Sequence, residues 1–203
     1  MALANALFGG ASAVVGEVAA MLPLLPRHAT LLDVGTGLGD IPARARVVAH
    51  RAGVTLDTVG LEAAEWAAIA CRPQTEMAIV GSALALPFAD ASVDIVTCSQ
   101  VLHHFFDADA RQLVRELERV ARRRVIISEI RRTRVAAAGI WAASFLLGFH
   151  PVSRHDGVVS VMRGFTQREL ADAVRAATGH DALVRRRPGF RVTASWTPAT
   201  ASG

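Results

Sequence analysis

The sequence predicts an α/β fold, with a doubly wound, mostly parallel sheet of seven strands and a helical insertion after the fifth strand. Three observations lead to this prediction. Apolar runs alternate with helical stretches as far as Ile130, a glycine-rich loop follows the first apolar run, and Pro188-Gly189 separates two apolar runs near the end. The chain has 203 residues, 52% of them hydrophobic and 20% charged, which is typical of one globular domain.

The first part of the chain contains five short apolar runs that we expect to form parallel strands. They are residues 30–34, 55–61, 77–80, 93–98 and 125–130. Residues 42–52 are expected to form a helix after the first strand. A second helix is expected to be capped by Asp107 and to end at Arg122-Arg123-Arg124, where cations complement the helix dipole. Its apolar face would consist of Leu113, Leu117, Val120 and Ala121.

The alternation of strands and helices breaks after the fifth strand. Residues 135–149 predict a helix, and residues 151–164 a loop. Thr166 and Glu169 have the spacing of a capping box, which opens a helix to about Ala177. Residues 182–187 and 190–196 should pair as an antiparallel hairpin. We therefore expect a single domain, 1–203, comprising a core at about 28–130, a cap at 131–165, and a closing helix and hairpin at 166–197.

The composition excludes several classes of enzyme. All 22 basic residues are Arg, and the chain has neither Lys nor Tyr. P-loop and kinase lysines, a Schiff base to pyridoxal phosphate and the Tyr-Lys pair of short-chain dehydrogenases are therefore excluded. Cys71 and Cys98 are far apart and have no His cluster near them, so we expect no disulfide, no metal and a reducing compartment.

No segment predicts secretion or a membrane span. The apolar N-terminus has no basic region and is interrupted by Glu17, unlike a signal peptide. The most apolar uncharged run, residues 135–149, falls short of the roughly 20 residues that a spanning helix needs. We therefore expect a soluble, cytoplasmic protein, either a monomer or a homodimer.

Charge divides the chain into an acidic and a basic part. Residues 1–110 carry a net charge of −6 and residues 111–203 a net charge of +10. The arginines in 122–134 and 185–191 could bind nucleic acid, and such binding would depend steeply on salt. Few aromatic residues alternate with these arginines, so we expect solvated helix ends and hairpin faces and no nucleic-acid partner. Nucleic-acid binding or RNA modification is kept as an alternative.

The loop after the first strand, Gly35-Thr36-Gly37-Leu38-Gly39-Asp40, is suited to holding a ligand against a helix N-terminus. A dinucleotide fingerprint would have glycine at the position of Asp40, beside the pyrophosphate. S-adenosylmethionine has one carboxylate, an ammonium and a sulfonium, and it tolerates the neighbouring carboxylates. Asp40 could equally be a helix N-cap. Glu62, at the end of the second strand, is placed to accept hydrogen bonds from ribose hydroxyls.

Five segments in sequence order resemble the class I S-adenosylmethionine-dependent methyltransferases, and most closely the group that includes quinone-biosynthesis methyltransferases. The segments are 31–42, 59–62, 81–88, 92–96 and 101–105. The resemblance implies a Rossmann-like fold whose seventh strand lies antiparallel between the fifth and sixth. It also implies S-adenosylmethionine as the cofactor.

Carried over by position, the resemblance places cofactor-binding residues at the ends of the strands. Those expected around the methionine part are Asp33, Gly35, Thr36 and Gly37. Those expected around the ribose and adenine, and at the mouth of the site, are Glu62, Ala63, Ser82, Ala83 and Ser99. Ser82 departs from the family, which usually has Asp there to accept from the adenine amino group. Weaker cofactor binding, or a protein that binds the cofactor without catalysis, follows as an alternative.

The acceptor is expected to be lipophilic. Ser99-Gln100-Val101 differs from the Asn/Asp-Pro-Pro-aromatic motif of amino-group methyltransferases, which leaves oxygen or activated carbon. Apolar residues in the cap would favour a phenol, quinone or polyketide, although they could instead form ordinary core or a dimer face. Residues expected to line it are Trp141, Phe145 and Phe149. The candidate bases are His103, His104, His150 and His155. Of these, His155 lies beside Asp156, which could orient it, and His104 shares with His103 a motif that is often structural; His155 and His104 are the preferred candidates.

Overall fold

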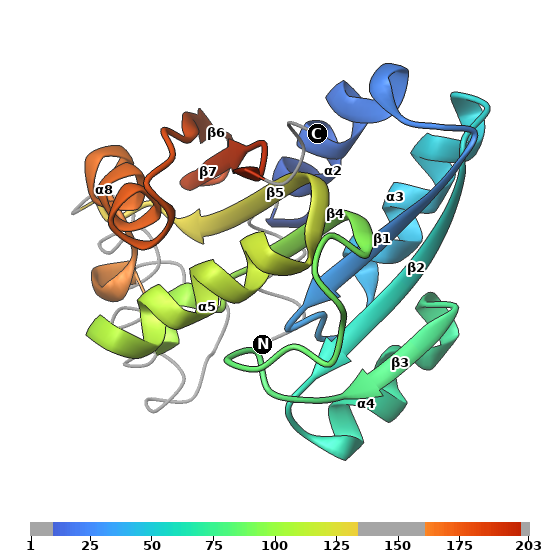
Figure 1. Ribbon diagram of the computed structural model, residues 1–203, viewed down its shortest axis with the longest axis horizontal. Coiled ribbons are helices and arrows are strands. Elements are labelled where there is room, and N and C mark those ends of the chain that lie inside the picture. Colours follow the sequence, from blue (N-terminus) through green and yellow to red (C-terminus); the bar gives the residue numbers. More distant parts are fainter. Residues whose placement is uncertain (1–9, 134–160, 200–203) are drawn as a thin grey trace, which may run out of the picture.

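The computed structural model describes residues 10–133 and 161–199, and its centre is a seven-stranded sheet with the order β3-β2-β1-β4-β5-β7-β6 (Figure 1). The strands are β1 (His28–Val34), β2 (Thr55–Glu62), β3 (Met77–Val80), β4 (Val93–Ser99), β5 (Ala121–Ile130), β6 (Leu183–Arg187) and β7 (Arg191–Trp196). The predicted fold class is confirmed, and the predicted strands are all present.

The sheet is parallel from β3 to β5 and antiparallel beyond it. β1 pairs in parallel with both β2 and β4, so the strand order reverses at β1. β7 runs antiparallel between β5 and β6, as expected. In parallel α/β sheets, ligands bind outside the carboxyl ends of the strands at such a reversal. The ends of β1, β2 and β4 are therefore the place to look for a site.

Helices cover both faces of the sheet, as Figure 1 shows. One face is covered by α2 (Gly10–Met21), α3 (Asp40–Arg51) and α4 (Glu65–Cys71), and the other by α5 (Asp107–Val120) and α8 (Gln167–Thr178). Single 3₁₀ turns occur at Leu22–Leu24, Arg72–Gln74 and Leu102–His104. Alternate residues of β1 supply the two cores, because Leu31 packs beneath α2 and α3 whereas Leu32 packs beneath α5.

Helix α2 was absent from the sequence prediction. Its residues are small and mostly apolar, so no polar stripe reveals its period. The signal that could have revealed it is the spacing of Ala11, Val14, Val18 and Met21, which lie in one buried cluster. Glu17, read above only as an interruption, is buried within this helix.

The predicted boundary between α5 and β5 was wrong. The helix ends at Val120, and Arg122-Arg123-Arg124 belong to the beginning of β5. Asp94 on β4 accepts hydrogen bonds from Arg122 Nη1 at 3.0 Å and Arg123 Nε at 3.1 Å. These arginines thus pair with the neighbouring strand instead of the helix dipole. At the other end, Phe106 is the N-cap and Asp107 the first helical residue, so Asp107 does not cap the helix.

The closing elements agree with the prediction. Thr166 and Glu169 form a reciprocal capping box, in which Glu169 N donates to Thr166 Oγ1 at 3.2 Å and Thr166 N to Glu169 Oε2 at 2.8 Å. Residues 134–160, which include the predicted helix 135–149, lie outside the described residues. The flanking residues Arg131 and Phe165 are joined by a parallel bridge at the carboxyl end of β5. No helix among residues 10–133 and 161–199 has the length and hydropathy needed to span a membrane.

Candidate cofactor and acceptor site

Asp33 lies near the end of β1, beneath the glycine loop, and is 1% exposed. Thr97 Oγ1 on β4 donates to Asp33 Oδ1 at 2.6 Å, whereas Oδ2 has no hydrogen-bond partner among the described residues. Burial raises the pKa of Asp33 to about 7. The hydroxyls of Thr97 and Thr36 lower it, and the charges of Asp40 and Glu62 raise it further. A carboxyl group with an unused buried oxygen is ready to receive a cationic ligand.

Gly35 and Gly37 shape the loop that follows β1. Both have positive φ, +69° and +61°, which disfavours other residues. A β-carbon on Gly35 would lie 2.3 Å from Cγ2 of Val101, so the backbone and the Val101 side chain are in close approach. A β-carbon on Gly37 would meet nothing within 4 Å. The space beside Gly37 is therefore open, as a ligand held against the loop requires.

Helix α3 begins directly after this loop. Its N-cap is Gly39, with φ +80°, and Asp40 is the first helical residue. The alternative of Asp40 as the N-cap is therefore wrong, because Gly39 holds that position in a left-handed conformation. The carboxylate of Asp40 lies in the first turn, where it interacts favourably with the positive end of the helix dipole. Its negative charge would repel a pyrophosphate at the same place.

Glu62, the last residue of β2, reaches the same loop. Its Oε1 accepts a hydrogen bond from the backbone N–H of Gly37 at 2.5 Å. The sequence analysis expected Glu62 at the ribose. The structure brings its carboxylate to the glycine loop, and Ala63 follows it as an exposed residue.

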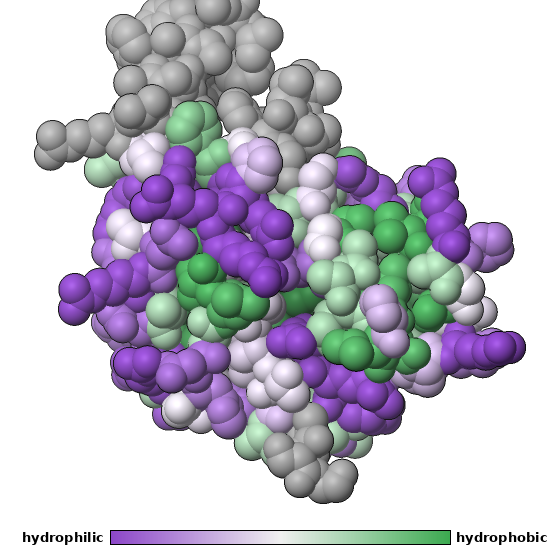
Figure 2. Space-filling model, turned by 90° about the horizontal axis from the view of Figure 1, so that it is seen from above, coloured by the Kyte–Doolittle hydropathy of each residue, from purple (hydrophilic) through white to green (hydrophobic). Residues whose placement is uncertain are grey.

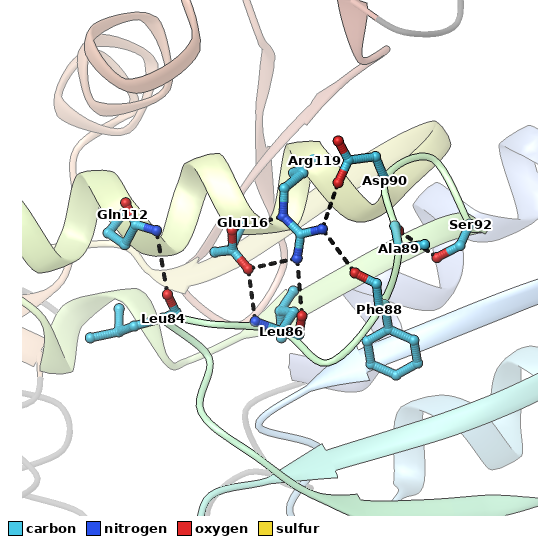
Figure 3. Close-up of polar contacts among 9 residues, drawn as sticks. All are labelled: Leu84, Leu86, Phe88, Ala89, Asp90, Ser92, Gln112, Glu116 and Arg119. Carbon is cyan, nitrogen blue, oxygen red and sulfur yellow. Dashed lines mark hydrogen bonds and ion pairs between the residues drawn. The ribbon is translucent and has the colours of Figure 1, made fainter.

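Ser82 and Ala83 begin the loop after β3, which helix α5 holds in place (Figure 3). Ser82 is exposed, and its Oγ accepts from Leu84 N at 3.2 Å. Part of its accepting capacity is therefore used within the loop. Further along, Leu86 N donates to Glu116 Oε2 at 2.7 Å, and Arg119 donates to the Leu86 and Phe88 carbonyl oxygens at 3.0 and 2.8 Å.

Ser99 ends β4 and pairs in register with Ser128 on β5. The hydroxyl oxygens of both serines are buried and have no hydrogen-bond partner among the described residues. Together with Asp33 Oδ2, they form a row of unused polar atoms at the ends of three neighbouring strands. Since buried polar atoms are normally paired, this row marks a place suited to the polar end of a ligand. The groups found here fit a cofactor with an ammonium and a carboxylate at one end.

Comparison with known proteins agrees with this arrangement. Residues 32–128 match the family model described as "Methyltransferase domain". Residues 32–128 therefore form a methyltransferase domain, similar to those of class I S-adenosylmethionine-dependent methyltransferases. No curated protein matches its sequence. The narrower likeness to the quinone-biosynthesis group remains a prediction.

Solved structures share the fold of this methyltransferase at low sequence identity. A SAM-dependent methyltransferase from Aquifex aeolicus is 15% identical, with a TM-score of 0.61. The alignment covers 90% of this chain and 88% of that chain. Magnesium protoporphyrin IX methyltransferase from Synechocystis PCC 6803, solved with bound SAH, is 15% identical, with a TM-score of 0.62 and coverages of 94% and 84%. An O-methyltransferase family protein from Burkholderia thailandensis is 16% identical, with a TM-score of 0.65 and coverages of 99% and 60%.

Beyond β4, the methyltransferase buries an imidazole against a carboxylate. His103 Nδ1 lies 2.8 Å from Glu129 Oε2, and Glu129 Oε1 accepts from Leu102 N at 2.8 Å. Glu129 is fully buried and His103 is 6% exposed. Glu129 lies near the carboxyl end of β5 and His103 in the 3₁₀ turn that follows β4, at the same edge of the sheet as the predicted cofactor residues. A carboxylate held in this way fixes the orientation of the imidazole.

The sequence analysis named His103 among the candidate bases but preferred its neighbour His104. The two rings are 4.1 Å apart between centroids. Desolvation lowers the pKa of His104 first, and the neighbouring His103 lowers it further, so His104 is mostly neutral at pH 7. The signal that could have favoured His103 is Glu129, the one acid in strand β5, which follows the apolar run Val125-Ile126-Ile127.

The other predicted base and the predicted acceptor pocket lie outside the described residues, since His155, Trp141, Phe145 and Phe149 fall within 134–160. Among the residues described on either side of that segment, no group of three or more His, Cys, Asp or Glu side chains could hold a metal ion.

Proposed function

We propose that this methyltransferase transfers the methyl group of S-adenosylmethionine to an oxygen or an activated carbon of a lipophilic small molecule, such as a phenol, a quinone or a polyketide. The observation that carries the proposal is the pair formed by His103 and Glu129, 2.8 Å apart at the carboxyl edge of the sheet. An oriented imidazole is useful where a hydroxyl or an acidic carbon must lose a proton, whereas a neutral aromatic amine can attack through its lone pair without a base.

The cofactor would be held by the residues at the ends of β1, β2 and β4. In this proposal Asp33 receives its ammonium, the N–H groups of the glycine loop approach its methionine part, and Glu62 turns from Gly37 to the ribose hydroxyls. Ser82 and Ala83 contact the adenine. When bound, the cofactor supplies a methyl group on a sulfonium, which is electrophilic without further activation.

The protein's own part in catalysis would be positioning, removal of water and removal of one proton. His103, oriented by the carboxylate of Glu129, or its neutral neighbour His104 accepts the proton of the acceptor hydroxyl. Residues 131–165 form the cap, with His155 at its polar edge. The bridge between Arg131 and Phe165 supports this part of the proposal, because it ties both ends of the segment to the end of β5.

Two relatives by fold support the choice of acceptor. One is described as an O-methyltransferase family protein, and another as a magnesium protoporphyrin IX methyltransferase. The nucleic-acid alternative is weakened by the pairing of its arginines. Arg122 and Arg123 bind Asp94, and Arg185 and Arg187 bind Glu17, so these guanidinium groups are partly neutralised within the protein.

The first test is calorimetric titration of the protein with S-adenosylmethionine, its demethylated product and NAD. We expect micromolar binding of the first two and none of NAD. The second test incubates the protein with methyl-labelled cofactor and matched phenols, quinols and aromatic amines. Labelled phenol or quinol supports the proposal, whereas labelled amine alone contradicts it. Cofactor binding with no product in any arm would favour the non-catalytic alternative.

A further inference from the structure

A second site lies away from the cofactor residues, between helix α2 and the strands β5, β7 and β6. It is a cavity of about 200 Å³, near the beginning of β5. In Figure 1 these elements form the upper part of the molecule, and Figure 2, seen from above, shows apolar areas there interrupted by hydrophilic side chains. Because the cofactor residues stand at the opposite ends of the parallel strands, a ligand here would not compete with the cofactor.

The charges around the cavity are unbalanced. Glu17 on α2 is 4% exposed. Its Oε2 accepts from Arg185 Nη1 at 3.1 Å, and its Oε1 accepts from Arg187 Nη2 at 2.5 Å and Thr193 Oγ1 at 2.8 Å. Both oxygens thus accept from Arg185, Arg187 or Thr193, and Arg124 donates to Met21 instead of to this carboxylate. One carboxylate therefore stands against three guanidinium groups.

Arg124 is the guanidinium that lacks an oxygen acceptor among the described residues. Its Nε donates to the thioether of Met21 at 3.0 Å, and sulfur is a weak acceptor for a charged donor. Desolvation lowers the pKa of Arg124, the charge of Glu17 partly offsets this, and the charge of Arg185 lowers the pKa further. An arginine that is half-buried, poorly paired and close to a second arginine would be stabilised by an anion.

The walls of the cavity indicate which kind of anion would fit. Leu24 and Leu183 border it and are 65% and 50% exposed, unusually high for leucine side chains, and Met21 and Ile126 add apolar surface. Bare inorganic anions gain nothing from such walls, whereas an organic anion can bury its hydrocarbon part. At about 200 Å³, the cavity is smaller than the roughly 300–1,000 Å³ typical of drug-sized ligands.

We infer that this cavity binds a small organic carboxylate, with its head on Arg124 and its short apolar tail against Met21, Leu24 and Leu183. The site is separate from methyl transfer. Its occupation would join α2 to the β5, β6 and β7 side of the sheet and so stabilise the fold.

The probe for this inference is hexanoate, with hexanol as the uncharged analogue and inorganic phosphate as the anion without a tail. Protein carrying ¹³C-methyl methionine reports binding at the site, because Met21 lines the cavity while Met77, on β3, does not. We expect hexanoate to shift the Met21 signal saturably, to leave the Met77 signal in place and to raise the melting temperature. Hexanol and phosphate should bind at least tenfold more weakly.

Two variants and a control make the test specific. Arg124→Gln should weaken hexanoate binding by about tenfold or more, the loss expected for charge-assisted hydrogen bonds. Leu183→Glu, which supplies a carboxylate from the protein, should abolish binding and raise the melting temperature without ligand. The control is Arg186→Gln, which removes a guanidinium from the residue after Arg185. Arg186 binds Gln167, so this variant should leave the affinity for hexanoate within about twofold. Unchanged affinity in Arg124→Gln, or phosphate bound as tightly as hexanoate, would overturn the inference.

Discussion

Arg119 and Glu116, one turn apart on α5, form a two-pronged ion pair whose guanidinium also holds the loop after β3. Arg119 Nε and Nη2 each donate to Glu116 at 2.8 Å, and Nη1 donates to Asp90 at 2.7 Å. This contact lowers the pKa of Glu116 and raises that of Arg119, since each charge stabilises the other. The loop after β3, which carries the predicted adenine contacts, is thereby fixed to helix α5.

Removing this guanidinium should loosen the loop. Arg119→Met leaves two carbonyl oxygens and Glu116 without their donor, so we expect the free energy of unfolding to fall by about 1–3 kcal/mol. Cofactor affinity should fall several-fold. Urea unfolding and calorimetry measure the two effects. Arg111→Met, on the exposed side of the same helix, is the control, and equal behaviour of the two variants would contradict this account.

Substitutions in the glycine loop should separate folding from binding. Gly37→Val fills the open space beside the loop, so it should abolish cofactor binding while the protein still folds. Gly35→Ala sets a methyl group against Val101 and should cost about 1–3 kcal/mol of stability. Gly16→Ala, in helix α2, meets nothing and should stabilise by about 0.5–1 kcal/mol. Calorimetry and thermal unfolding would check all three, and cofactor binding by Gly37→Val at normal affinity would place the ligand elsewhere.

Loss of the carboxylate at the end of β2 should weaken cofactor binding without preventing it. Glu62→Ala should cost about 1–3 kcal/mol of binding free energy, the usual loss for a hydrogen bond to a charged acceptor. Glu62→Gln should cost less. The exposed Glu65, nearby on α4, provides the control variant Glu65→Ala. If calorimetry finds the same affinity for all of these proteins, the ribose is not held by Glu62.

Asp33 should make both stability and cofactor affinity depend on pH near neutrality. Its pKa is about 7 in the folded protein and near its ordinary value of 3.8 when unfolded. Between these values the unfolded chain binds fewer protons, so this group lowers stability as pH rises from about 4 to about 7. Asp33→Asn should therefore be more stable than the parent protein at pH 8, and the difference should disappear towards pH 4.

The same titration should appear in binding, with the opposite sign. A ligand with an ammonium group prefers the ionised carboxylate, so affinity should rise between pH 5.5 and 8, with proton release on binding near pH 7. Calorimetry in buffers of different ionisation enthalpy measures that proton. The affinity of Asp33→Asn should be lower and nearly independent of pH. The exposed Asp57→Asn should behave as the parent protein, and an equal pH dependence in all three would refute the assignment.

The three candidate bases, His103, His104 and His155, can be ranked by kinetics once an acceptor is found. His103→Gln should lower turnover on a phenol by roughly 10²-fold, the low end for loss of a general base, with cofactor affinity unchanged. Glu129→Gln should lower it less and alter the pH profile. His104→Gln and His155→Ala test the bases chosen from sequence. The exposed His50→Gln is the control, and a loss confined to His155→Ala would assign the role to the cap.

The sequence was most informative where residue type and backbone geometry are closely connected. Alternating apolar runs predicted the strands, and Thr166 and Glu169 predicted the start of α8. The glycines predicted the loop that follows β1. Proline and glycine between two apolar runs located the hairpin. In each case, the physical cause acts over a few residues, so a short stretch of sequence contains it.

What could not be predicted depends on contacts between distant segments. Arg122 appeared to belong to a helix end, since only the fold reveals Asp94 beside it. His103 looked no different from His104 until Glu129, 26 positions away, was found against its ring. Glu17 interrupted an apolar run, and its arginine partners are 168 and 170 positions away. Ion pairs of this kind leave no periodic signal in the sequence.

The use of guanidinium groups as backbone donors has a consequence for protein engineering. Between Leu86 and Ser92, four carbonyl oxygens accept from Arg119 or Arg122, in a stretch that has neither helix nor strand. A flat fork with five donors reaches several oxygens at once, whereas an ammonium group acts as a single point. Exchanging arginine for lysine here would therefore leave main-chain oxygens without donors. The exchange would conserve the charge, but we expect the loop between Leu86 and Ser92 to lose its shape.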